Sequence, residues 1–374
     1  MKRNWHEPNY TLIGTIILLI IFGLIMLSSA SSVEGFEKFS DPNYFVKHQL
    51  LYGVCLGLPM MWLLTRLDYH IWKQLAFPMM AVSVVLLLLV LVPGIGVELL
   101  GAKRWIGFGG IIFQPSEIVK LTFLIYLAVW LEAKEKAIHD WSTGLAPFSI
   151  MIGFLVFMIA LVQKDLGTMI VIGIIAMAAY FVAGAPWKHL LVLGGSGLAV
   201  ILFFVKVLPL IIPSFSYRAH RLTVFLNPDL DPLGIGYHIN QALLAIGSGG
   251  LLGVGLGRSR QKFNYLPEAS NDSIFAVVAE EMGFIISVGL VILYMVFMVQ
   301  GYRVAKTAPD TYGKILAAGI TTWIIFQAIV NIMAMLALVP LTGIPLPLVS
   351  YGSTSLVMLL AALGILINIS RQTK

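Results

Sequence analysis

The stretch Thr11–Leu27, TLIGTIILLIIFGLIML, decides the class of fold because it carries no charged residue. A helix needs roughly 17–25 mainly apolar residues to cross the hydrocarbon core of a membrane. Comparable apolar runs follow along the chain, and together they lie near 11–30, 47–65, 74–93, 114–131, 145–162, 167–184, 189–210, 274–302, 312–340 and 346–369. The runs are too long for barrel strands, so the sequence predicts an all-α polytopic membrane protein with about ten transmembrane helices.

The composition agrees with a chain that uses the bilayer as its solvent. Of its 374 residues, 59% are hydrophobic and 11% are charged, whereas soluble domains carry roughly 25% charged residues. The single cysteine, Cys55, excludes an internal disulfide and carries no metal or redox signal. The net charge of +6 comes from loops and helix ends, which indicates membrane topology and anionic ligands and no nucleic acid.

The distribution of lysine and arginine predicts the orientation. With the N- and C-termini in the cytoplasm, most cationic residues of the short loops lie inside, as the positive-inside rule requires. The segment 211–273 then forms a large extracytoplasmic loop between helices seven and eight, with short interfacial helices. The outer segments also hold the glycine, proline and polar clusters, so we expect an extracytoplasmic site. Because no Walker-type loop occurs, the reaction must use energy stored in the substrate.

Asp272 is the first candidate for catalysis. It precedes the run Ser273–Ala279, at the outer mouth of the helix predicted over 274–302. The structural alternative is an N-cap, which any of the residues 271–273 would satisfy, so one carboxylate is available for chemistry. Glu280 and Glu281 follow about 12–14 Å deeper in the same helix. Carboxylates at that depth are usually paired or functional.

Glu117 and Lys120 raise the same question in the run 114–131. Three residues apart, they share one helix face and can neutralise each other. In the functional alternative, Lys120 faces a cavity and orients or charge-matches Asp272. In the outer loop, His238 and Gln241 could bond sugar hydroxyls, although such residues more often satisfy the local backbone. The sequence has no ligand spacing typical of a zinc site.

Cationic residues form the third group of candidates. They come in three clusters in the outer segments, Lys103 with Arg104, Arg218 with Arg221, and Arg258 with Arg260 and Lys262. Guanidinium groups suit phosphate and pyrophosphate oxygens, while the 258–262 cluster could instead attract anionic lipid head groups. A substrate with a lipid tail, a pyrophosphate and sugars would match these features. The carboxylate would act as general base, and the cations would stabilise the departing pyrophosphate.

Four stretches resemble the SEDS family, the FtsW/RodA-type proteins of bacterial cell division and elongation. They are KRWIGFGGIIFQPSEIVKL (103–121), DLGT (165–168), PLTGIPLPLVSYGSTS (340–355) and the central block GYHINQALLAIGSGGLLGVGLGRSRQKFNYLPEASNDSIFAVVAEEMGF (236–284). The likeness covers nearly the whole chain, so residues 1–374 are expected to form a single SEDS-type transmembrane domain. The family has ten transmembrane helices and a large outer loop between the seventh and the eighth.

The resemblance also implies an activity, a peptidoglycan glycosyltransferase that polymerises lipid II. It places the essential carboxylate on Asp272, the cavity-lining pair on Glu117 and Lys120, and the paired arginines on Arg218 and Arg221. The 4-hydroxyl of the acceptor GlcNAc would attack C1 of the donor MurNAc, and undecaprenyl pyrophosphate would leave. Inversion at C1 would give a β-1,4 glycan strand. Two further residues of these motifs complete the candidate site, Glu268 and Ser350.

The resemblance further predicts surroundings and partners. The chain is expected in the bacterial cytoplasmic membrane, with a class B penicillin-binding transpeptidase and other division or elongation machinery as partners. No organic cofactor is expected, and the sequence leaves open whether a divalent cation, Mg or Mn, assists. Three departures from the family pattern are Lys164 in place of proline before DLGT, Ser273 in place of phenylalanine after Asp272, and SYGSTS in place of SYGGSS. The central block is slightly closer to division-type FtsW.

Two other functions compete with the polymerase. A flippase that moves lipid II outward would use the intramembrane Glu117, Lys120, Glu280 and Glu281 as a translocation path or proton relay. Alternating access needs gates on both faces, and the predicted inner loops are short and plain, which favours the enzyme. A non-catalytic scaffold for a transpeptidase would tolerate replacement of Asp272.

Overall fold

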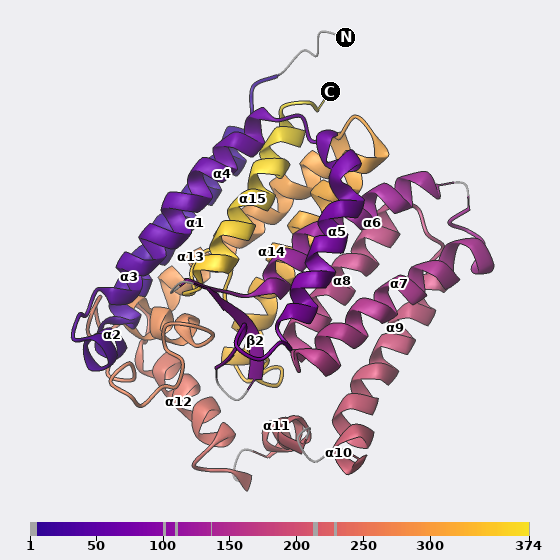
Figure 1. Cartoon of the computed structure of the whole chain (residues 1–374). Helices are drawn as coiled ribbons and strands as arrows, with labels where there is room; N and C mark the ends of the chain where they lie inside the picture. The colour runs from indigo at the N-terminus through magenta and orange to yellow at the C-terminus, as the bar shows by residue number, and fades with distance from the viewer. Residues whose placement is uncertain are drawn as a thin grey trace.

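The computed structural model describes residues 6–99, 102–108, 111–135, 137–211, 216–227 and 230–373. These residues form a bundle of long helices, and both chain ends lie at the same end of the bundle (Figure 1). The backbone N–H of His6 donates to the carbonyl of Arg371 over 2.8 Å. Helices α11 and α12 lie at the opposite end (Figure 1). The chain termini and the 211–273 segment are therefore on opposite sides of the bundle.

The helices follow the apolar runs of the sequence, with short π-helical segments (η) within several of them. In the first half they are α1 (Tyr10–Ala30), α2 (Ser32–Phe39), α3 (Tyr44–His48), η1 (Gln49–Val54), α4 (Cys55–Arg66), α5 (Ile71–Leu89), α6 (Pro115–Ala133), η2 (Trp141–Leu145), α7 (Ala146–Phe157), η3 (Met158–Val162) and α8 (Leu166–Val182). In the second half they are α9 (Trp187–Leu202), η4 (Phe203–Val207), α10 (Leu208–Ile211), α11 (Ser216–Leu226), α12 (Ile235–Ser248), α13 (Ile274–Thr307), α14 (Thr311–Met335) and α15 (Ser353–Ser370).

Seven helical stretches in the described residues are long and apolar enough to cross a membrane. They lie in α1, α5, η2–η3, α9–η4, α13, α14 and α15. The other three predicted runs are helical as well, as the unbroken segment Tyr44–Arg66, as α6 and as the 17-residue α8. The fold is confirmed as a helical multi-pass bundle, and the count of ten stays a prediction.

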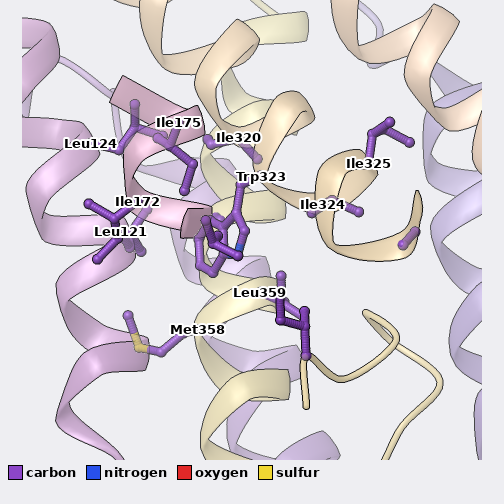
Figure 2. Packing of buried hydrophobic residues seen from close by; sticks show 14 of the residues in the cluster. Leu121, Leu124, Ile172, Ile175, Ile320, Trp323, Ile324, Ile325, Met358 and Leu359 are labelled. Carbon is purple, nitrogen blue, oxygen red and sulfur yellow. The ribbon is translucent and has the colours of Figure 1, made fainter. Parts of the chain in front are cut away.

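The centre of the bundle is formed by α14 and α15. In the most apolar stretch of α14, 72% is buried inside the protein, and in that of α15 the share is 78%. For α9 with η4 the share is 6%, and α9 lies at the edge of the bundle (Figure 1). Trp323 of α14 is fully buried. Side chains of α6, α8 and α15 surround it, among them Leu121, Ile172 and Leu359 (Figure 2). This apolar contact fixes the helices that carry the intramembrane polar residues.

A small sheet corrects the expectation of a purely helical chain. Residues 96–113 form three antiparallel strands, β1 (Gly96–Leu99), β2 (Ala102–Phe108) and β3 (Ile111–Phe113), in the order β1-β2-β3. Gly96 pairs with Ile106 and Phe108 with Ile111. The segment between α5 and α6 is rich in glycine, which disfavours a helix, and hairpin pairing satisfies the backbone of its strands. The membrane part of the chain is helical, as predicted.

Helix α13 is interrupted at Gly283, whose φ of 75° and ψ of −176° are not helical. Four hydrogen bonds from the preceding loop satisfy the backbone at this break, Val254 N to Glu280 O, Gly255 N to Glu281 O, Phe284 N to Gly250 O and Ile285 N to Leu251 O. A Cβ on Gly283 would lie 2.2 Å from the Gly253 nitrogen, so only glycine fits. The loop 249–255 therefore completes α13 where the helix itself cannot, as a membrane segment requires.

Candidate active site around Asp272

Asp272 lies in the turn that leads into α13. The N-cap of α13 is Ser273, whose side chain makes no capping hydrogen bond. The N-cap position of α13 is therefore occupied by Ser273 and not by Asp272. The side chain of Asp272 is partly buried, and its Oδ1 is buried with no hydrogen-bond partner among the described residues. Gly343 lies against the other oxygen, because a Cβ there would be 3.8 Å from Oδ2.

Burial determines the acidity of this carboxyl. It raises the pKa of Asp272 from 3.8 to about 7, with a further upward contribution from the charge of Glu268 and an opposing one from Arg221. A general base works best when its pKa lies near the operating pH. Asp272 therefore has the protonation behaviour that proton abstraction from a hydroxyl requires.

Asp272 and its neighbours are held by the segment 341–351 and by α14. The Nδ2 group of Asn331 donates to the carbonyls of both Asp272, at 2.7 Å, and Ile344, at 2.8 Å. Ser350 Oγ donates to the Asn271 carbonyl over 2.6 Å and accepts from Leu346 N over 2.8 Å. The motif at 340–355 thus supports the turn of Asp272. Ser350, expected to contact substrate, uses its hydroxyl for this support.

Two further candidate residues contact the neighbours of Asp272 in the chain. Nε2 of His238 is 2.7 Å from Ser273 Oγ, and burial lowers the pKa of His238 to about 4. Glu268 accepts from Asn271 Nδ2. Gln241, one turn further along α12, has a buried Oε1 without a partner among the described residues.

The four cationic candidates of the first two clusters have different surroundings. Arg221 is near Asp272 and donates from Nη1 to the Leu341 carbonyl at 3.0 Å, while the side chain of Arg218 lies outside the described part of the structure. Arg104 donates to the carbonyls of Gln163, at 3.2 Å, and Lys164, at 2.8 Å. Lys103 is exposed on β2. Of these residues, Arg221 has the position expected for a cation at the site.

Lys262, predicted to bind phosphate groups, is instead buried in an ion pair. Its ammonium group donates to Ser29 Oγ at 2.9 Å, to the Gly257 carbonyl at 2.8 Å and to Glu281 Oε1 at 2.9 Å. These bonds use all three N–H groups, and the side chain is 3% exposed. It is therefore not available for phosphate, unlike its exposed neighbours Arg258 and Arg260. Spacing along the loop could not reveal the buried partner.

Glu117 and Lys120 form an ion pair inside the bundle. Their charged atoms are 2.7 Å apart, and their side chains are 6% and 1% exposed. The Lys120 ammonium also lies 5.1 Å from the centre of the Trp323 ring. No contact between Lys120 and Asp272 occurs within the described part of the chain. The structure brings the pair together, as the self-neutralising alternative requires, and its role toward Asp272 stays a prediction.

A cavity was expected around Glu117 and Lys120, and the hollow in the described structure has a different lining except for Ser350. It is lined by Gln327 of α14, by part of the segment 345–352 and by Ser355, Leu356 and Leu359 of α15. Its lining includes neither Asp272 nor Lys120. Gln327 accepts a hydrogen bond from Trp323 Nε1 at 2.7 Å. The described residues hold no cluster of three or more His, Cys, Asp or Glu suited to a metal ion, so no residue is assigned to a divalent cation.

Comparison with known proteins gives the family. A family model described as cell cycle protein, FtsW/RodA/SpoVE, matches residues 10–374. The chain is 42% identical over 374 residues to stage V sporulation protein E of Bacillus subtilis, which covers 100% of both chains. It is 38% identical over 358 residues to a probable peptidoglycan glycosyltransferase FtsW of Geobacter sulfurreducens, covering 96% of this chain and 94% of the relative.

Solved structures agree with this result. A chain of a peptidoglycan synthase complex that coordinates polymerization and crosslinking matches with a TM-score of 0.80 and 31% identity, over 98% of each chain. The rod shape determining protein RodA of Thermus thermophilus matches with a TM-score of 0.68 and 28% identity, over 99% of each chain. The family model covers nearly the whole sequence, and both fold and length agree with these relatives. The chain is therefore a multi-pass membrane protein that belongs to the FtsW/RodA/SpoVE family.

Proposed function

We propose that this protein is a peptidoglycan glycosyltransferase that polymerises lipid II, with Asp272 as the general base. The observation that carries the proposal is the Asp272 carboxyl, which precedes the N-cap residue of α13 and has a buried oxygen without a partner in the described residues. Relatives of 38% identity that are named probable peptidoglycan glycosyltransferases support the same class of enzyme.

The proposed reaction needs one proton acceptor and an activated donor. Asp272 takes the proton of the 4-hydroxyl of the acceptor GlcNAc while the oxygen attacks C1 of the donor MurNAc. The bond from C1 to the pyrophosphate breaks, and undecaprenyl pyrophosphate leaves with the electron pair. Inversion at C1 produces the β-1,4 bond. A carboxylate with a pKa of about 7 is half ionised at neutral pH, so it can accept and later release this proton.

The leaving group requires positive charge near the site. Arg221 lies close enough to lower the pKa of Asp272 and is anchored to the Leu341 carbonyl. A guanidinium group held in this way would stabilise the pyrophosphate as its charge develops. Arg258 and Arg260 are exposed on the same loop and are available for the substrate or for lipid head groups.

The surroundings of the site suit a substrate with a lipid tail. Helices α11 and α12 lie at the end of the bundle opposite to the chain termini (Figure 1). If both termini are cytoplasmic, this end is extracytoplasmic, on the side where lipid II carries its sugars. A class B penicillin-binding transpeptidase is the proposed partner, supported by the similar chain in a peptidoglycan synthase complex.

A lipid II flippase is the second candidate function, and the contacts of the buried acidic residues of α13 argue against it. Glu280 accepts from Arg260 N at 2.8 Å and from Ser259 Oγ, and Glu281 is paired with Lys262. Carboxylates that hold the backbone of a loop are poorly suited to relay protons. A flippase also needs polar groups on the inner face, where alternating access requires a second gate. On the side of the chain termini the structure does have a polar cluster, around His70 and Asp310, which the sequence had not indicated.

The test is synthesis of glycan chains from purified lipid II in liposomes, with wild type, Asp272→Asn and a partner transpeptidase that has no glycosyltransferase of its own. Polymer from the wild type and none from well-folded Asp272→Asn is the expected result. Polymer from both proteins would make Asp272 dispensable and support a scaffold. No polymer from either, together with transfer of labelled lipid II across the bilayer, would favour the flippase.

A further inference from the structure

Three consecutive residues at the site are held by three different parts of the chain. Ser350 binds the Asn271 carbonyl, Asn331 binds the Asp272 carbonyl, and His238 contacts the Ser273 hydroxyl. The first two come from the segment 341–350 and from α14. The third comes from α12, which is part of the 211–273 segment. The contact from His238 therefore joins α12 to the turn that carries Asp272.

The direction of this hydrogen bond follows from the partners of Ser273. The Ser273 hydroxyl donates its single hydrogen to the Pro267 carbonyl over 2.7 Å. Its oxygen can then only accept at the contact with His238, which measures 2.7 Å. The hydrogen in this bond must be on Nε2 of His238. The geometry thus selects the Nε2–H tautomer, and the Nδ1 atom carries the lone pair.

The electrostatics keep the ring in this form. Burial, assisted by the positive charge of Arg221, lowers the pKa of His238 to about 4. The imidazole is therefore neutral near pH 7 and has one N–H to donate. Since Ser273 is buried without any exposed surface, the chain His238 to Ser273 to Pro267 is shielded from competing water.

We propose that His238 is a positioning residue, which acts through Ser273 to hold the turn 267–273 so that the Asp272 carboxylate meets the acceptor hydroxyl. This inference rests on the proposed function. Ser273 is one of the residues that departs from the family pattern, and phenylalanine at this position could not accept the hydrogen bond. A displacement of about 1 Å at a reacting group can lower the rate by about two orders of magnitude, so loss of the bond should reduce turnover.

Two substitutions of His238 separate this role from direct contact with the substrate. The amide nitrogen of glutamine reaches about as far as Nε2, and that of asparagine about as far as Nδ1. If His238 acts through Ser273, His238→Gln retains most of the turnover and His238→Asn loses it. If Nδ1 instead binds a sugar hydroxyl, the order is reversed.

The serine is tested in parallel. Ser273→Ala removes the acceptor, and Ser273→Thr retains a hydroxyl and should rescue turnover. Ser248→Ala, an exposed residue at the end of α12 whose hydroxyl bonds only the Ala245 carbonyl in the described structure, serves as the matched control. Combining His238→Asn with Ser273→Ala should be no worse than either change alone, because both break the same bond.

The experiment measures the rate at saturating lipid II, the KM and the melting temperature of each variant beside wild type and Asp272→Asn. We expect turnover to fall about tenfold in Ser273→Ala and His238→Asn, with KM within about twofold. Equal losses in His238→Gln and His238→Asn, or a change in KM alone, would overturn the inference while polymer from wild type and none from Asp272→Asn leaves the proposed function intact. No polymer from wild type with its partner would overturn both.

Discussion

The ammonium of Lys262 and the carboxylate of Glu281 form an ion pair of 2.9 Å in which the two side chains are 3% and 0% exposed. Ser29 of α1 binds both partners, donating to Glu281 over 2.7 Å and accepting from Lys262 over 2.9 Å. The pair therefore joins three parts of the chain, α1, the loop before Asp272 and α13. This arrangement keeps the first turns of α13 in place beside the break at Gly283.

Removing one partner of this pair should destabilise the protein strongly. Lys262→Met leaves the Glu281 carboxylate buried without its cation, which costs about 3–5 kcal/mol. Thermal unfolding in detergent measures the effect. The double variant Lys262→Met/Glu281→Gln should recover part of the loss, and Lys47→Met, which breaks an exposed pair with Asp41, should change little. A Lys262→Met protein as stable as Lys47→Met would contradict the account.

The rate of polymerisation should depend on pH through Asp272. The general base must be ionised, so activity should rise with pH up to about 7 and level off above it. The charge of Glu268 raises the pKa of Asp272, so Glu268→Gln should move the rising limb to lower pH. Arg221 lowers that pKa, so Arg221→Gln should move the limb upward.

Profiles of kcat/KM from pH 5 to 9, which report the groups of the free enzyme, check these shifts. Glu7→Gln, at an exposed carboxyl near the chain termini, is the control for a change of charge and should leave the limb in place. Identical profiles for wild type and Glu268→Gln would show that Asp272 does not set the limb.

Substitution of Asn331 should lower turnover as much as substitution of the site residues predicted from the sequence. It is 1% exposed, and its Nδ2 group supports the carbonyls of Asp272 and Ile344. Asn331→Asp has the same shape but no donor, so it places a carboxylate against two carbonyl oxygens. We expect the unfolding free energy to fall by about 1–3 kcal/mol and turnover to fall further than stability explains. Asn240→Asp, on the exposed face of α12, is the control, and equal turnover in the two variants would exclude a role for the bond.

The sequence could predict the bundle but not the contacts that build the site. Apolar runs predict helices such as α1 and α14 because a membrane leaves the backbone few alternatives. The bonds from His238 to Ser273 and from Asn331 to Asp272 join residues 35 and 59 positions apart. Such pairs depend on how helices pack, so hydropathy carries no signal for them. For Asn331, the available sign was an amide side chain, like that of Gln327, within a mainly apolar run.

Two other features escaped prediction for a related reason. The strands within 96–113 were not predicted, because the glycines of this segment suggested only a loop. Strand formation depends on which residues pair along the hairpin, and glycine content does not indicate that pairing. The break in α13 lies in a continuous apolar run, and it is tolerated only because the loop 249–255 supplies the missing hydrogen bonds. The ion pair of Lys262 follows from that docking.

The side of the chain termini holds a polar anchor that should make stability depend on pH. Asp310 accepts from Tyr69 Oη at 2.9 Å and from Gly313 N at 2.6 Å and contacts His70. Burial alone would raise the pKa of Asp310, but these hydrogen bonds hold it below its usual 3.8. The ionised form is thus stabilised in the folded protein, so this contribution is present above the usual pKa and is lost as the pH falls through the lowered value.

Asp310→Asn should therefore lower the melting temperature at neutral pH, and the difference from wild type should shrink at acidic pH below the ordinary pKa of an aspartate. Unfolding scans of both proteins across this range measure the effect. A constant difference at every pH would show that ionisation of Asp310 contributes nothing.

In the proposed reaction, the Asp272 carboxylate takes the proton of the acceptor hydroxyl as the new bond forms. The most direct test of this role is the initial rate of glycan synthesis from lipid II by Asp272→Asn, relative to wild type, with equal melting temperatures and the same partner transpeptidase. We expect the rate to fall by roughly 10²–10⁴-fold, the range for loss of a general base. A rate within about threefold of wild type would contradict the account, because an amide of the same shape cannot accept that proton.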